Sequence, residues 1–178
     1  MTSGGSMFNS FFLKLLFFAM LPIILAASSY GFWFTYKYMK KTSFQSGKAI
    51  STLVITLFIV HPNLVQFMFN DFNCKNIDGT QRIYLDLEIV CWSSLHTFWS
   101  FSVALPAIVV WGLGIPAFAF YLMTKEKTRL NSLETRMKFG FLYNGYKLDY
   151  YYWEVIIMYR KIILIFISVF IQNYGVMV

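Results

Sequence analysis

Residues Leu15 to Phe34, with the sequence LLFFAMLPIILAASSYGFWF, decide the fold class of this 178-residue chain. The stretch is apolar at odd and even positions alike, with Pro22, two serines and Gly31 as interruptions. A membrane β-strand would alternate polar and apolar side chains, whereas a membrane helix needs about 20 mainly apolar residues. Because backbone in lipid must pair its own polar groups, this stretch predicts a membrane-spanning helix.

Further apolar stretches of similar length follow, and together they predict an all-α membrane protein. The composition agrees, since 58% of the residues are hydrophobic and 13% are charged, which is more apolar than a soluble domain of this size requires. We expect a bundle of four transmembrane helices whose second and third members are kinked. The spans are expected at residues 11–36, 49–70, 97–123 and 152–174.

The N-terminal region admits two readings. We expect residues 1–10 to form a flexible tail and residues 11–178 to form the transmembrane domain. A cleaved signal peptide, with Ala26-Ala27-Ser28 as the cleavage site, is the alternative for the first span. Its apolar region is longer than the usual signal-peptide core and continues into Trp33 and Lys37, which favours a span.

Basic residues gather in the two loops that follow the first and third spans. Most of the 15 Lys and Arg residues lie on that side of the expected topology, and the loop between the second and third spans is acidic. The basic loops carry Lys37, Lys40, Lys41, Lys48, Lys125, Lys127, Arg129, Arg136, Lys138 and Lys147. The positive-inside rule places these loops in the cytoplasm. Both termini and the loop at 71–96 are then extracellular or lumenal, in a membrane that the sequence does not identify.

Helix-breaking residues are concentrated in the second and third spans. These residues are Pro62, Pro106, Gly112, Gly114 and Pro116. Each proline removes one backbone hydrogen bond of its helix, so we expect kinks at these positions. Kinked helices can line a water-filled path, but close packing between helices is the favoured reading, because glycines let neighbouring helices approach.

Ionisable residues at membrane depth are the candidate functional residues. Glu154, Arg160 and Lys161 lie in the fourth span and His61 lies in the second. Charges in lipid cost several kcal/mol unless they pair or reach water. The functional interpretation is an ionic cluster that positions helices or gates a change between them. The alternative is that the charged side chains snorkel to the cytoplasmic border and that His61 is a hydrogen-bonded bundle residue.

The acidic loop contains both cysteines of the chain. Cys74 and Cys91 are a candidate disulfide if this loop faces an oxidising compartment. A zinc site made of both cysteines with His61 and His96 is the alternative, but the close paired spacing of zinc ligands is lacking. We therefore predict no metal and no cofactor.

Enzyme and nucleic-acid functions are not expected. The sequence lacks a Gly-x-Ser-x-Gly elbow, a His-Glu-x-x-His helix and a phosphate-binding loop. The net charge of +7 is explained by membrane orientation and predicts no nucleic-acid partner. The expected partners are the lipid bilayer and other transmembrane helices or subunits.

Several motifs between residues 49 and 178 together resemble one family of membrane proteins. They are Cys91-Trp92-Ser93-Ser94-Leu95-His96-Thr97-Phe98-Trp99, Leu105-Pro106, Trp111-Gly112-Leu113-Gly114-Ile115-Pro116, Phe139-Gly140-Phe141-Leu142-Tyr143-Asn144-Gly145-Tyr146-Lys147, Tyr151-Tyr152-Trp153-Glu154 and Tyr159-Arg160-Lys161. Their combined order resembles the membrane region of large protist proteins, especially of ciliates, described as transient-receptor-potential-like or polycystin-like. The resemblance implies a polytopic, cation-conducting or signalling domain.

The same resemblance limits the expected function. Such proteins carry a long Cys-rich region before the spans and further spans after them, and in channels of this type the last two helices build the pore. We therefore expect a channel-like or sensor-like domain that lacks its own pore. The alternative is a structural membrane subunit or assembly factor of a larger membrane complex.

Overall fold

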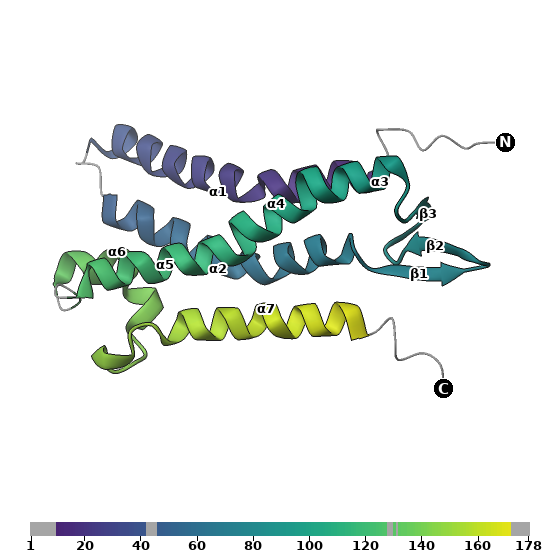
Figure 1. Ribbon diagram of the computed structural model, residues 1–178. Coiled ribbons are helices and arrows are strands. Elements are labelled where there is room, and N and C mark those ends of the chain that lie inside the picture. Colours follow the sequence, from purple (N-terminus) through teal and green to yellow (C-terminus); the bar gives the residue numbers. More distant parts are fainter. Residues whose placement is uncertain (1–9, 42–45, 128–129, 131, 172–178) are drawn as a thin grey trace.

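The computed structural model describes residues 10–41, 46–127, 130 and 132–171. It is a mostly helical protein with a small sheet at one end (Figure 1). The elements are α1 (Ser10–Lys40), α2 (Ser46–Asn70), β1 (Cys74–Ile77), β2 (Thr80–Ile83), β3 (Asp86–Val90), α3 (Ser94–Trp99), the π-helical segment η1 (Ser100–Ala104), α4 (Leu105–Ala107), a second π-helical segment η2 (Ile108–Leu113), α5 (Gly114–Lys125), α6 (Leu133–Tyr143), the 3₁₀ turn η4 (Leu148–Tyr150) and α7 (Trp153–Ile171). Residues 1–9 of the expected flexible tail and the residues of the fourth span after 171 lie outside the described part, and Ser10 is the first residue of α1.

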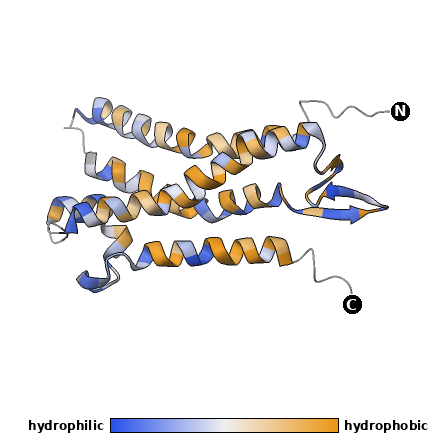
Figure 2. Cartoon of the chain, viewed as in Figure 1, coloured by the Kyte–Doolittle hydropathy of each residue, from blue (hydrophilic) through white to orange (hydrophobic). Residues whose placement is uncertain are grey.

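Within the described residues, three helical stretches are long and apolar enough to cross a membrane, so this is a membrane protein. They are Ser10–Lys40, Gly47–Asn70 and Ser94–Lys125. Figure 2 shows their hydrophobic middles and the hydrophilic residues at both ends of the bundle. The fourth predicted span corresponds to α7, which has the required length at 19 residues but contains Glu154, Arg160 and Lys161. Its crossing of the membrane stays a prediction.

The prediction of an all-α fold is wrong for residues 74–90, which form a three-stranded antiparallel sheet of order β1-β2-β3. Ile77 pairs with Thr80, so the β1–β2 turn consists of Asp78 and Gly79. Both turn residues have positive φ, at 49° and 79°. An Asp-Gly turn of this kind matches the twist of a hairpin, and the pair is a strong sequence signal for one.

Helix α2 occupies the centre of the bundle. It packs against α1, α6, α7 and η2. The start of α1, the end of α7 and the sheet lie at one end of the molecule, while the end of α1, the start of α2, the end of α5 and the start of α6 lie at the other (Figure 1). The helix ends that border the two basic loops are therefore at the same end.

The predicted helix breakers have different local effects. Helix α2 continues through Pro62. Pro106 lies in α4, between the two π-helical segments, and Pro116 lies in the first turn of α5. A π-helical segment widens the helix locally and leaves carbonyl groups available to other partners. The expected bends at these positions stay predictions.

Candidate functional site

A polar cavity of about 230 Å³ lies between α2, α6 and α7. It is lined by Phe58, Ile59, His61, Pro62, Phe141, Glu154, Met158 and Lys161. The structure thus brings together His61, Glu154 and Lys161, three of the four predicted ionisable residues. Arg160 does not line the cavity, and its side chain is exposed on another face of α7.

The buried side chain of His61 connects α2 to the third span. Its Nε2 donates a hydrogen bond to the carbonyl oxygen of Gly112, at 2.9 Å. In a regular α-helix that carbonyl would accept from the residue four positions later, which is Pro116 and has no N–H. The imidazole therefore fills an acceptor that the proline leaves open. Gly112 and Pro116, two of the predicted helix breakers, thus take part in one interaction with the predicted histidine, His61.

Glu154 is held at the start of α7 by the connection from α6. The Tyr146 hydroxyl donates to Glu154 Oε2, at 3.0 Å. Burial, followed by the neighbouring Glu154 carboxylate, raises the pKa of the Tyr146 hydroxyl. The Tyr143 hydroxyl donates to the Leu130 carbonyl, at 2.9 Å, and fixes α6 against the preceding loop. The carboxylate of Glu154 is therefore positioned rather than free to rotate into solvent.

A second polar cluster is buried below the sheet, where α2 ends and α3 begins. His96 Nδ1 accepts from the Trp92 backbone N–H at 3.0 Å, and its Nε2 faces the Asp71 carbonyl at 3.1 Å. Asp71 Oδ1 lies 3.8 Å from His96 Nε2. Asp71, His96 and Ser100 are all 0% exposed. Neither carboxylate oxygen of Asp71 has a hydrogen-bond partner in the described residues.

This cluster contains Asp, His and Ser, but its geometry is not that of a nucleophilic triad. Because Nδ1 of His96 accepts a backbone N–H, the ring proton lies on Nε2. Ser100 donates its hydroxyl proton to the His96 carbonyl, at 2.9 Å. The imidazole thus has no free lone pair with which to activate Ser100. The cluster therefore acts structurally, tying the sheet to α2 and α3.

The buried carboxyl of Asp71 should make stability depend on pH. Burial raises its pKa, against smaller opposing effects of Ser100 and His96. A carboxyl whose pKa is higher in the folded protein stabilises fully below its unfolded value of about 3.9. That stabilisation is lost as pH rises through the folded value. We expect Asp71→Asn, which cannot ionise, to raise the melting temperature in detergent more at pH 7 than at pH 4.

Differential scanning fluorimetry at the two pH values measures this effect. Glu88→Gln is the matched control, because Glu88 is an exposed acid in strand β3 of the neighbouring sheet. The control should shift the melting temperature equally at both pH values. An equal shift for Asp71→Asn as well would show that the ionisation of Asp71 is not linked to folding.

The cysteines of the sheet are joined by a disulfide between Cys74 and Cys91. In this form they offer no thiolate to zinc, and His61 and His96 are engaged at Gly112 and Asp71. In the described residues no group of three or more His, Cys, Asp or Glu could hold a metal ion. With both cysteines in the disulfide they cannot serve as ligands of the alternative zinc site, and the absence of a metal stays a prediction.

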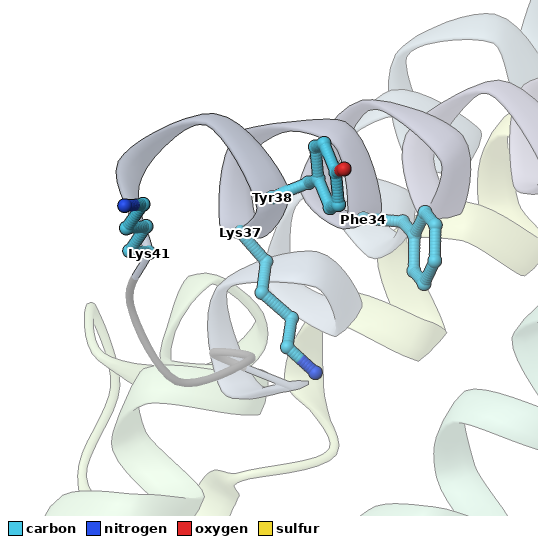
Figure 3. A pocket seen from close by; sticks show the side chains of 4 residues that line it. All are labelled: Phe34, Lys37, Tyr38 and Lys41. Atoms are coloured by element: carbon cyan, nitrogen blue, oxygen red, sulfur yellow. The ribbon is translucent and has the colours of Figure 1, made fainter.

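A second cavity, of about 570 Å³, lies at the C-terminal end of α1. Phe34, Lys37, Tyr38 and Lys41 line it, and Lys37 and Phe34 extend to the same side of the helix (Figure 3). Lysines in the last turn of a helix complement the negative end of its dipole. Together with the aromatic rings, they are typical of a helix end at the headgroup level of a membrane.

Comparisons with known proteins give one curated relative. Cysteine repeat modular protein A of Toxoplasma gondii is 32% identical over 127 residues, which are 67% of this chain and 4% of that protein. The chain therefore spans about 4% of the length of the relative. No protein-family model and no solved structure matches the chain. The resemblance to channel-like proteins of ciliates stays a prediction.

Proposed function

We propose that this chain is a sensor-like, multi-pass membrane domain without enzymatic activity and without its own pore. The single observation that carries the proposal is the course of α2. This helix reaches the buried Asp71–His96 cluster at one end, bonds the third span through His61 in its middle, and packs against α6 near its start. A conformational change in the sheet can therefore be transmitted along α2 to the polar cavity and to the end of the bundle where α2 begins.

Coupling through α2 is tested by hydrogen exchange on the full chain in lipid nanodiscs. Opening the disulfide with Cys74→Ser/Cys91→Ser should loosen the sheet and increase exchange severalfold at residues 57–63 and 108–116. Lys75→Ser, beside the bridge but exposed, is the control. If the increase in exchange is confined to residues 71–96, changes in the sheet are not transmitted along α2, and the sensor proposal is wrong.

The proposed topology has four crossings, with both basic loops in the cytoplasm and both termini extracellular or lumenal. We expect Lys40→Cys and Lys138→Cys to react with an impermeant maleimide from the same side of sealed vesicles, and Tyr84→Cys to react from the other side. All three positions are described, and Tyr84 is 51% exposed. The native cysteines are joined in the disulfide and do not compete. Labelling of positions 40 and 138 from opposite sides would contradict the topology.

The absence of a pore is a separate proposal, and planar bilayers test it. Because Glu154 and Lys161 line a cavity of about 230 Å³, which is small for an ion path, purified protein should give no discrete cation currents over a wide voltage range. Currents that change with Glu154→Gln would instead show that the domain conducts.

A structural role in a larger membrane complex is the second candidate. Its support is the exposed apolar surface of α1, where Phe17, Phe32 and Phe34 are 54%, 61% and 58% exposed. The large size of the Toxoplasma relative also fits a domain that works within a bigger protein. Purification from native membranes should then give a complex of fixed stoichiometry, and recovery of the chain only as a monomer would count against this role.

A further inference from the structure

The polar cavity between α2, α6 and α7 contains two opposite charges that do not pair with each other. Glu154 and Lys161 both line it, seven residues apart on α7 and thus about 10 Å apart along the helix axis. In the described part of the chain, the ion pairs are His96–Asp71 and Lys138–Glu134. Glu154 is half-buried and Lys161 is exposed. In a membrane, a charged side chain that faces lipid rather than water is costly without a counterion. The cavity therefore lacks one anionic and one cationic partner.

We propose that this cavity binds a compact zwitterion of the phosphoethanolamine type, with its phosphate at Lys161 and its ammonium at Glu154. The spacing of the two side chains favours this class. An α-amino acid carries both charges on one carbon, whereas a phosphate and an amine joined by a short linker can reach two positions separated by two helical turns. The volume of about 230 Å³ corresponds to about eight water molecules at ~30 Å³ each, which suits a headgroup.

The other walls of the cavity suit the ammonium end. Phe58 and Phe141 lie edge-on to each other, with ring centroids 6.2 Å apart, and both line the cavity. Aromatic faces attract ammonium groups, most strongly where water is excluded. The Tyr146 hydroxyl donates to Glu154 Oε2. No hydrogen bond from a described residue engages Oε1, which leaves this oxygen for the ligand.

The phosphate end has its own environment. The ammonium of Lys161 acts electrostatically on His61, so the two side chains face a common space. His61 uses Nε2 to hold the Gly112 carbonyl and does not neutralise Lys161. An anionic oxygen is the natural partner for such an ammonium, and charge-assisted bonds of this kind are about twice as strong as neutral ones.

A phosphoethanolamine group can come from a free metabolite or from a membrane lipid. Beyond Phe58 lies an apolar groove of about 540 Å³, lined by side chains from α2, η2, α5 and α6. Phe58 lines both spaces. Because hydrocarbon chains can occupy that groove, the lipid-borne group should bind more tightly than the free one.

The test is native mass spectrometry of the full chain released from nanodiscs containing equal amounts of phosphatidylethanolamine and phosphatidylglycerol. Wild type should retain phosphatidylethanolamine at least tenfold more than phosphatidylglycerol. Lys161→Met and Glu154→Gln should each abolish this preference. Arg160→Met, one residue away but outside the cavity, should keep it. Added O-phosphoethanolamine distinguishes the two sources. If it displaces phosphatidylethanolamine, the free group also binds. If it does not, and the preference for phosphatidylethanolamine is intact, the site binds only the lipid.

Equal retention of the two lipids by wild type would overturn the proposal, and this comparison requires no variant. An equal loss of preference in Arg160→Met and Lys161→Met would also overturn it, because surface charge would then explain the binding. Melting temperatures of all variants identify any that fail to fold. The lipid preference is independent of hydrogen exchange at the sheet, so either proposal can fail alone.

Discussion

Replacing Cys74 and Cys91 together with serine is expected to destabilise the protein by about 3 kcal/mol. The bridge joins residues 17 positions apart, and closing a loop of about that length removes roughly this much conformational freedom from the unfolded chain. Cys91 is also 6% exposed and packs with Ile83 and Ile89 under the sheet. For a chain of this size the loss corresponds to a fall in melting temperature of about 6–12 °C.

Thermal unfolding in detergent, followed by intrinsic fluorescence, measures this change. Lys75→Ser serves as the control, since it adds a serine beside Cys74 without touching the bridge. Peptide mapping without reduction should recover residues 74 and 91 in one cross-linked species. Two alkylatable thiols in the native protein, or a melting temperature unchanged by the double substitution, would show that no bridge stabilises the sheet.

His96→Ala is expected to cost about 3 kcal/mol, the second large effect. It removes the acceptor of the Trp92 N–H, in a part-buried hydrogen bond, and the donor to the Asp71 carbonyl, in a buried one. Buried polar groups left without partners cost about 1–3 kcal/mol each. Trp92 also adopts a positive φ of 62°, which is strained for a bulky residue. Without His96, this turn loses the bond that holds it.

The matched control is Phe98→Ala, in the same helix but 59% exposed, which should change stability little in detergent. A double-mutant cycle with Asp71→Asn separates the polar contact from packing. If Asp71 and His96 interact, His96→Ala should cost at least about 0.5 kcal/mol less in the Asp71→Asn background. Additive losses would limit His96 to its backbone contacts.

The sequence predicts the membrane class because the evidence for it is local. A helix in lipid needs a run of apolar residues, and the stretch around Leu15–Phe34 shows this without any tertiary information. The first hairpin of the sheet can also be predicted from the sequence, because Asp78-Gly79 is a hairpin signal. The acidic residues around this turn are equally typical of a loop, so hydropathy does not predict the strands. Short strands outside the membrane are predicted from their turn residues instead.

The candidate site was predictable only as a set of residue types. The cost of charge in lipid singled out Glu154, Lys161 and His61, but their convergence depends on how α2 and α7 pack. Arg160 is also a charge in a predicted span, but its side chain lies on a face of α7 that does not line the cavity. Asp71 and Ser100 gave no signal at all, since a carboxylate in a polar loop and a serine in a helix are ordinary. Only the contact of α2 with α3 reveals their cluster.

The bond between His61 and Gly112 implies a dependence between two distant positions of the chain. The imidazole is needed because Pro116 cannot donate to that carbonyl. If residue 116 were alanine, its own N–H could reclaim the oxygen, and the ring at position 61 would be released toward the neighbouring polar space. A protein that has lost the proline should therefore tolerate other residues at position 61, whereas one that keeps it should not.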